Sequence, residues 1–179
     1  MPYLRSLPEP ARLADLFQTF PDHTAPLLSY VESLMRGKGE IPIRDRELIS
    51  AYVSGLNACQ FCYGSHRIFA EAFGIEEGLL AELLADLDAA PIDPSSKALL
   101  AYAKKLNTLP SRMVQADIDA VLAVGWSEQA VAEAAQICGL FNLMNRIIEG
   151  TGIDFDYETA PDAKTLLGLE QGAEDHHYI

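Results

Sequence analysis

Apolar residues recur at helical spacing along most of the chain, and short polar breaks separate the segments that carry the pattern. Between residues 24 and 37, Leu27, Val31 and Leu34 fall three or four positions apart, which is the period of one face of an α-helix. The same period predicts further helices over residues 43–56, 57–74, 76–86, 93–110, 114–125 and 127–150. Strand-like alternation is found only in the short stretch "IDFDY" at residues 153–157. The pattern therefore predicts an all-α protein.

Residues that commonly begin or end helices lie at several of the predicted boundaries. Asn57 suits the N-cap and Gly74 the C-cap of the helix between them, and Ser127 suits the N-cap of the longest helix. The connections are short, as is typical of a compact helical bundle. We therefore expect a single helical-bundle domain over residues 1–159. A tail over residues 160–179 would follow, either docked on a neighbouring subunit or frayed.

The chain length and composition agree with one helical domain, and the net charge excludes one class of partner. A chain of 179 residues suits one domain, and its formal net charge is -13. Because such a surface repels phosphate and no Lys/Arg cluster offsets it, nucleic acid is not an expected partner. The tail carries His176 and His177, for which a mobile terminus is the simpler interpretation than a metal site.

Neither a secretory signal nor a membrane span is expected. The longest charge-free run, Leu48–Ser65, contains several polar residues and two glycines, which favours a protein interior over a lipid-facing helix. The N-terminus lacks the cationic start and the apolar core of a signal peptide. An odd number of cysteines, three, and the absence of such a signal favour the reducing cytoplasm. In that compartment a close cysteine pair is more often catalytic or metal-binding than structural.

The segment "NACQFCYGSHR", residues 57–67, carries the candidate chemistry. On one helix, Cys59, Cys62 and His66 would lie within an arc of roughly 60° on a single face. An imidazole can take the proton of a neighbouring thiol, and the second thiol can then close a disulfide. The helix dipole favours Cys59 as the thiolate, whereas adjacency to the imidazole favours Cys62. The spacing thus permits a two-electron redox cycle.

Glu47 is a candidate partner for the imidazole. If the helices on either side of residues 55–58 pack antiparallel, Glu47 and His66 each fall about two turns from the connection. A carboxylate in that position can orient the imidazole and stabilise its protonated form, completing a proton relay with Cys62. The alternative is an ordinary solvated acid in the first turn of a helix, where carboxylates are favoured.

The cysteines have alternatives too. A buried cysteine can be a small apolar core residue, and the apolar surroundings of Cys138 indicate that role. Cys59, Cys62 and His66 are also competent zinc ligands. A structural zinc site needs a fourth ligand, which only Glu47 or Cys138 could supply.

The spacing E-x(11)-C-x(2)-C-x(3)-H is formed by Glu47, Cys59, Cys62 and His66. It resembles the active-site signature of the alkylhydroperoxidase D-like proteins of the carboxymuconolactone decarboxylase superfamily. The surrounding "DRELISAYVSGLNACQFCYGSHRIF" is similar in particular to the branch of uncharacterised peroxidase-related proteins. The segment "GWSEQAVAEAAQICGLFNLMNRIIEGTGI" resembles the closing helix of that family.

The resemblance implies an all-helical fold that assembles as a homo-oligomer, commonly a trimer or hexamer. It also implies reduction of hydroperoxides without a metal or organic cofactor, with regeneration by a thiol reductant. In the family's mechanism the second cysteine, Cys62, attacks the peroxide and the first, Cys59, resolves the sulfenic acid. His66 and Glu47 match the relay that deprotonates the attacking thiol. We therefore expect a cytoplasmic thiol peroxidase or related disulfide oxidoreductase.

One departure from the family concerns Phe61, which stands where the best-known members carry a second histidine. Its loss removes a hydrogen-bonding group and makes the pocket more apolar, which raises thiol pKa values. Two other functions remain open: a non-enzymatic helical oligomer that senses redox state or binds metal through the same cysteines, and a small-molecule enzyme of the lactone decarboxylase kind. The cysteine pair is generally missing from the decarboxylase branch.

Overall fold

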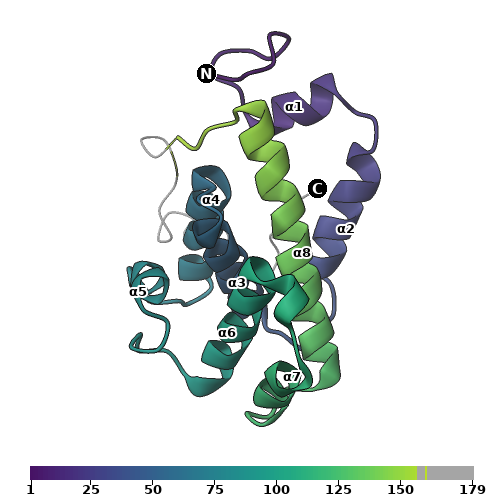
Figure 1. Ribbon diagram of the computed structural model, residues 1–179. Helices are drawn as coiled ribbons and strands as arrows, with labels where there is room; N and C mark the ends of the chain where they lie inside the picture. The colour runs from purple at the N-terminus through teal and green to yellow at the C-terminus, as the bar shows by residue number, and fades with distance from the viewer. Residues whose placement is uncertain (157–159, 161–179) are drawn as a thin grey trace.

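The computed structural model describes residues 1–156 and 160, and these residues form an all-helical protein (Figure 1). The predicted fold class is confirmed. The helices are α1 (Leu13–Thr19), α2 (Thr24–Arg36), α3 (Ile43–Leu56), α4 (Gln60–Ala72), α5 (Leu79–Ala85), α6 (Pro94–Thr108), the short 3-10 helix η1 (Pro110–Arg112), α7 (Gln115–Leu122) and α8 (Glu128–Thr151). Residues 160–179, predicted to form a tail, lie outside the described residues apart from Ala160, as do His176 and His177.

Helices α3 and α8 organise the bundle. The long α8 runs the height of the molecule, with α2 on one side and α4 on the other (Figure 1). Every residue of α3 from Asp45 to Ser54 is buried, and α3 packs most extensively against α4. The first part of the charge-free run, residues 48–54, therefore forms protein interior as expected, whereas Ala58 and Gln60 later in the run are exposed. None of the described helices is long and apolar enough to cross a membrane.

Several predicted helix ends are confirmed in atomic detail. The Ser127 hydroxyl accepts hydrogen bonds from the backbone N–H groups of Gln129 and Ala130 at 3.0 and 3.4 Å. This cap satisfies donors that the first turn of α8 would otherwise leave without partners. Gly74 follows α4 with φ of 101°, a left-handed conformation that stops the helix and that glycine adopts without strain.

The predicted start of α4 at Asn57 is wrong. The helix begins at Gln60 and its N-cap residue is Cys59. Asn57 instead ends α3, with its backbone N–H bonded to Val53 O at 3.0 Å. The connection then turns through Ala58 in a left-handed conformation, φ 56°. Asn57 is unavailable as a cap because its side chain is bonded to amides of α6 and α8, contacts that no local pattern reveals.

Two further differences concern the ends of the chain. Helix α1 was not predicted, because its seven residues are too few for a clear period. The described part of "IDFDY", residues 153–156, forms no strand. It instead follows the left-handed Gly152 at the end of α8 and packs back onto α4, where the Phe155 ring lies against Gly64.

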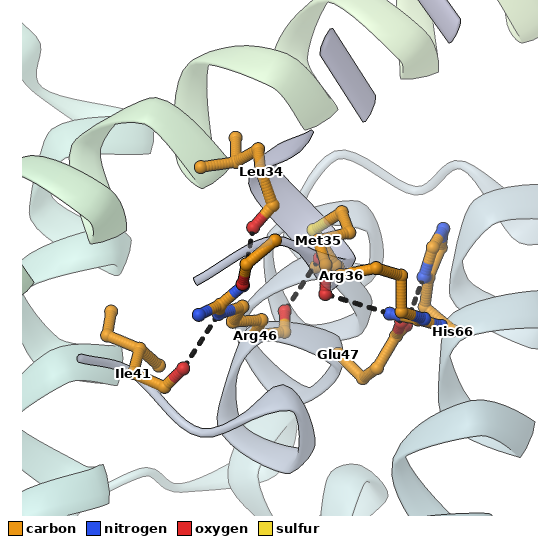
Figure 2. Close-up of polar contacts among 9 residues, drawn as sticks. Leu34, Met35, Arg36, Ile41, Arg46, Glu47 and His66 are labelled. Carbon is orange, nitrogen blue, oxygen red and sulfur yellow. Dashed lines mark hydrogen bonds and ion pairs between the residues drawn. The ribbon is translucent and has the colours of Figure 1, made fainter. Parts of the chain in front are cut away.

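Two buried charged side chains, Arg46 and Glu133, hold the loop between α2 and α3 through its backbone. The Arg46 guanidinium donates to the carbonyl oxygens of Leu34, Gly37 and Ile41 at 2.9, 2.8 and 2.7 Å (Figure 2). The carboxylate of Glu133, on α8, accepts from the backbone N–H groups of Glu40 and Ile41. These contacts hold the end of α2 against the start of α3, which positions the functional residues described next.

Candidate active site

Glu47 and His66 meet inside the bundle, as the antiparallel packing of α3 and α4 predicts. The Glu47 Oε2 atom lies 2.5 Å from His66 Nδ1 (Figure 2). Glu47 is 0 % exposed and His66 is 8 % exposed, so the alternative of a solvated acid at position 47 is wrong. With Nδ1 engaged by the carboxylate, the imidazole is held in one orientation.

Arg36 is the second partner of Glu47, and the sequence did not point to it. Its Nη1 atom lies 2.5 Å from Glu47 Oε1, and its side chain is 2 % exposed. The guanidinium also lies over the rings of Phe69 and Phe73, 5.8 and 5.3 Å from their centroids. Burial alone would raise the pKa of Glu47, but His66 and Arg36 outweigh it and lower that pKa below its usual range. Glu47 is therefore a buried carboxylate that stays ionised.

A cavity of about 580 Å³ opens beside the imidazole. Cys62 and His66 both line it, and α1, α2, α4 and α8 supply its walls. Most of the lining is apolar: Leu13, Phe17, Leu28, Val31, Phe61, Phe69, Phe141 and Met144. Phe61, which stands where the family's second histidine is found, thus forms part of an apolar wall. The cavity can hold an organic molecule of moderate size next to the Cys62 thiol.

The two cysteines occupy the start of α4, in the order that the sequence predicts but with different roles in the helix. Cys59 is the N-cap residue, and Cys62 lies in the first turn. Both are free thiols and both are buried. Of the two, Cys62 lines the cavity and Cys59 does not.

The pKa values of the two thiols are shifted in opposite directions. A hydrogen bond from the Cys62 thiol lowers the pKa of Cys59, with help from the Cys62 backbone N–H, while burial opposes it. The same hydrogen bond raises the pKa of Cys62, and burial raises it further. In the reduced resting state, the thiolate is therefore favoured on Cys59, as expected for the N-cap position.

A cluster of side-chain amides lies behind the cysteines and was also missed. Asn145 of α8 is 2 % exposed and donates to Ser54 Oγ at 3.0 Å. Cys59 and burial raise the pKa of Cys62, and the Asn145 side chain opposes this shift. Asn57 donates to Asn145 Oδ1 at 2.9 Å. Asn145 and Cys62 lie on helices that are far apart in the sequence, so only the fold reveals this cluster.

The third cysteine is separate from the pair. Cys138 is buried, and its sulfur is 3.8 Å from Ala103 O, which agrees with its predicted place in the core. Within the described part of the chain, no three histidine, cysteine or acidic side chains converge in a way that could hold a metal ion.

Solved structures of known proteins share this fold. An alkylhydroperoxidase AhpD core protein from Ralstonia eutropha JMP134, described as an uncharacterised peroxidase-related protein, matches with a TM-score of 0.75 and 23% identity, over 80% of this chain and 75% of its own. An uncharacterised peroxidase-related protein from Silicibacter sp. TM1040 matches with a TM-score of 0.77 and 21% identity, over 83% of this chain and 78% of its own. These likenesses establish an alkylhydroperoxidase D-like fold.

The sequence model of the carboxymuconolactone decarboxylase family matches residues 21–105. This span contains Glu47, His66 and both cysteines at the start of α4. The match covers just under half of the chain, and together with the shared fold it supports the predicted resemblance to this superfamily. No functionally curated protein matches its sequence significantly.

Another structure with this fold broadens the range of known chemistry. It is a cysteine-to-alanine variant of the debrominase Bmp8 in complex with 2,3,4-tribromopyrrole, with a TM-score of 0.67 and 20% identity over 87% of this chain and 81% of its own. The fold therefore occurs both in a protein described as peroxidase-related and in a debrominase.

Proposed function

We propose that this protein is a thiol-dependent peroxidase that reduces organic hydroperoxides with Cys62 and Cys59. The observation that carries the proposal is the Glu47–His66 contact of 2.5 Å at the wall of a cavity that Cys62 also lines. A buried carboxylate, an oriented imidazole and a thiol together are the parts of a proton relay.

The relay works through the two nitrogens of His66. Nδ1 faces Glu47, so Nε2 is the nitrogen that can exchange a proton with a thiol or a leaving oxygen in the cavity. When His66 takes the Cys62 proton, the ionised Glu47 stabilises the imidazolium. Arg36 keeps Glu47 ionised throughout, because its guanidinium carries a permanent charge.

The proposed reaction balances over two steps. The Cys62 thiolate attacks the terminal oxygen of the hydroperoxide, the O–O bond breaks, and the alkoxide leaves as an alcohol after taking the proton held by His66. The Cys59 thiolate then attacks the sulfur of the resulting Cys62 sulfenic acid, and hydroxide leaves and becomes water by taking a proton from the solvent. A thiol reductant returns the disulfide to two thiols by exchange.

Access supports the assignment of Cys62 as the attacking thiol. The resting thiolate is favoured on Cys59, but Cys59 does not line the cavity, whereas Cys62 does. A peroxide in the cavity therefore meets Cys62 first. Before Cys62 can attack the peroxide, it must lose its proton, which in the resting state lies in the hydrogen bond to Cys59. In the proposed mechanism His66, paired with Glu47, takes that proton.

The apolar lining favours organic hydroperoxides over hydrogen peroxide. A small polar peroxide gains little from a cavity walled by leucine, phenylalanine and methionine side chains, whereas an alkyl or aryl hydroperoxide buries apolar surface there. Reducing partners and a reducing compartment, such as the cytoplasm, are part of the proposal because the cycle needs free thiols.

A second candidate function is reductive debromination of an aromatic compound. It is favoured by the likeness to Bmp8 and by the aromatic walls that Phe61, Phe69 and Phe141 form. Here two thiols would supply two electrons, bromide would leave, the ring carbon would take up a proton, and the same disulfide would form.

One experiment distinguishes these functions. The reduced protein is mixed with cumene hydroperoxide, hydrogen peroxide or 2,3,4-tribromopyrrole, and the loss of thiols is followed by mass spectrometry together with alcohol or bromide release. We expect fast formation of a Cys59–Cys62 disulfide with cumene hydroperoxide, slower reaction with hydrogen peroxide and no bromide. His66→Gln is expected to lower the rate roughly 100-fold, the usual size of a general-base effect.

The cysteine variants give the controls. Cys59→Ser should stop at a sulfenic acid on Cys62, and Cys138→Ala should react as the parent does because Cys138 lies outside the cavity. If Cys62→Ser is oxidised as fast as the parent, the assignment of Cys62 is wrong. Bromide release without peroxide turnover would replace the peroxidase by the debrominase.

A further inference from the structure

A second cavity, of about 380 Å³, lies next to the cavity that Cys62 and His66 line. The N-terminal segment, α1, the turn before α2, α2 itself and the end of α8 supply its lining. Most of that lining is apolar: Leu4, Leu16, Phe17, Phe20, Leu27 and Ile147. No described residue of α4 belongs to it, so the second cavity lies away from the reacting groups.

The polar residues of the second cavity leave its interior apolar. The hydroxyl of Thr24 donates to Phe20 O at 3.1 Å, and that of Thr151 donates to Ile147 O at 2.7 Å. Asp22 and His23 are exposed to solvent. The space inside therefore suits an aliphatic chain rather than a polar group.

Helix α1 forms a wall between the two cavities. Ala14 and Gln18 line the catalytic cavity alone, Leu16 and Phe20 line the second cavity alone, and Phe17 lines both. Because successive residues of an α-helix are about 100° apart, Leu16 lies on one side of Phe17, with Ala14 and Gln18 on the other. The Phe17 ring therefore stands at the boundary.

Thr24 is the other described residue that lines both cavities, and its side chain is fixed. Its bond to Phe20 O ties the start of α2 to the end of α1. Phe17 is partly buried and packs against the core. Since Thr24 is small, the aromatic ring of Phe17 is the larger obstacle between the two cavities.

We propose that Phe17 is a specificity-determining residue that limits the length of the alkyl chain in the substrate. Its ring closes the catalytic cavity toward the second cavity, so the site accepts alkyl hydroperoxides whose chain ends at that ring. This inference deepens the proposed function and rests on it for the identity of the substrate.

The physical reason is where each carbon of the chain goes. The catalytic cavity reaches from α4, which carries Cys62 and His66, to α1. A methylene that moves from water into an apolar cavity strengthens binding about fourfold. Carbons beyond the Phe17 ring stay in water and add nothing. Without the ring, the two cavities join and the chain continues into the second one.

The test measures binding without any peroxide chemistry. Linear primary alcohols from butanol to dodecanol, the products of the proposed reaction, are titrated into the reduced protein by isothermal titration calorimetry. For the parent we expect the affinity to rise about fourfold with each methylene up to a limiting length and then to stay constant. In Phe17→Ala the rise should continue beyond that length.

Two variants are the controls. Phe20→Ala removes a ring of the same size that lines the second cavity alone and is 46 % exposed, so its limiting length should equal that of the parent. Phe17→Trp keeps the boundary closed, and its limiting length should be no longer. Chemical unfolding verifies that each variant folds. If Phe17→Ala does not fold, Phe17→Leu decides the case, because its smaller side chain should also lengthen the limit.

Three results would overturn the inference. One is a limiting length in folded Phe17→Ala that equals the parent value. Another is a parent protein whose affinity rises through the whole series, since its cavities would then already be joined. The third is a Phe20→Ala variant that lengthens the limit as much as Phe17→Ala does.

The same variants then reduce alkyl hydroperoxides of the same chain lengths, which separates this inference from the proposed function. KM should fall with chain length as the alcohol affinity rises, with kcat unchanged. If the alcohol series behaves as expected but no hydroperoxide is reduced, the role of Phe17 in the cavity stands and the proposed function fails. If hydroperoxides are reduced while the limit in Phe17→Ala stays unchanged, the function stands and the role of Phe17 fails.

Discussion

At the scale of single residues, the site is determined by which charges are buried together. Glu47 is a fully buried carboxylate between a permanent cation, Arg36, and an imidazole, His66 (Figure 2). Removing one partner of such a group is costly because the remaining charge stays without compensation in a medium of low polarity. Arg36 thus matters for the state of Glu47 although it does not line the cavity beside Cys62.

Replacing Arg36 tests this balance. We expect Arg36→Met to lower the free energy of unfolding by about 3–5 kcal/mol at neutral pH, because it leaves Glu47 without its permanent counter-charge. Urea unfolding followed by circular dichroism measures the change. Adding Glu47→Gln to Arg36→Met should restore part of the loss. If the double variant is as unstable as the sum of the single variants, the two residues are not coupled.

At the scale of elements, side-chain caps and one buried turn set where the helices begin. Asp93 caps α6, and its Oδ1 accepts from Ser96 N at 2.9 Å and from Ser95 Oγ at 2.5 Å. Although burial opposes it, these hydrogen bonds lower the pKa of Asp93 to about 2. The cap is therefore strongest when Asp93 is ionised.

The lowered pKa of Asp93 makes the stability of the folded protein depend on pH. A carboxyl group whose pKa falls from 3.8 to about 2 on folding adds stability above pH 3.8, and this stability is lost as the pH falls toward 2. We expect Asp93→Ala to cost about 1 kcal/mol at pH 7 and progressively less at lower pH. Unfolding curves recorded between pH 7 and pH 2 measure the cost of the substitution and its dependence on pH.

The variant Asp93→Asn is the control, because it keeps a capping oxygen but cannot ionise. Its stability relative to the parent should therefore rise as the pH falls. A constant difference would contradict this account.

At the scale of the whole molecule, the bundle leaves large apolar side chains on its surface. Tyr30 of α2 and Leu143 of α8 are 42 % and 49 % exposed, and the Tyr30 hydroxyl is bonded to Gln136 of α8. Exposed apolar side chains on neighbouring helices are typical of surfaces that pack against another subunit. This agrees with the homo-oligomer, a trimer or hexamer, that the family resemblance implies.

A single charged substitution tests the assembly. We expect light scattering to find the protein as an oligomer at micromolar concentration, and Leu143→Glu to shift it toward the monomer because it introduces a charge into the contact. Lys38→Glu, which changes the charge of an exposed loop residue, is the control and should leave the assembly intact. A parent protein that is monomeric at all concentrations would exclude this prediction.

Much of this protein could be predicted from its sequence because the signals are local. Helical periodicity and the cap at Ser127 depend on residues within one or two turns of each other. The E-x(11)-C-x(2)-C-x(3)-H spacing spans a single helical hairpin, so it predicted the Glu47–His66 contact and the position of both cysteines near the start of α4. The resemblance to the superfamily followed from the same segment, which lies within the residues that match the family model.

Only the tertiary structure decided the rest. The start of α4 at Gln60, rather than at Asn57, depends on amides of α6 and α8, and the roles of Arg36 and Asn145 depend on helices far apart in sequence. The cavity has walls from four helices, one of which the pattern missed. Burial and long-range hydrogen bonds determine which polar groups meet, and a one-dimensional pattern contains no record of them.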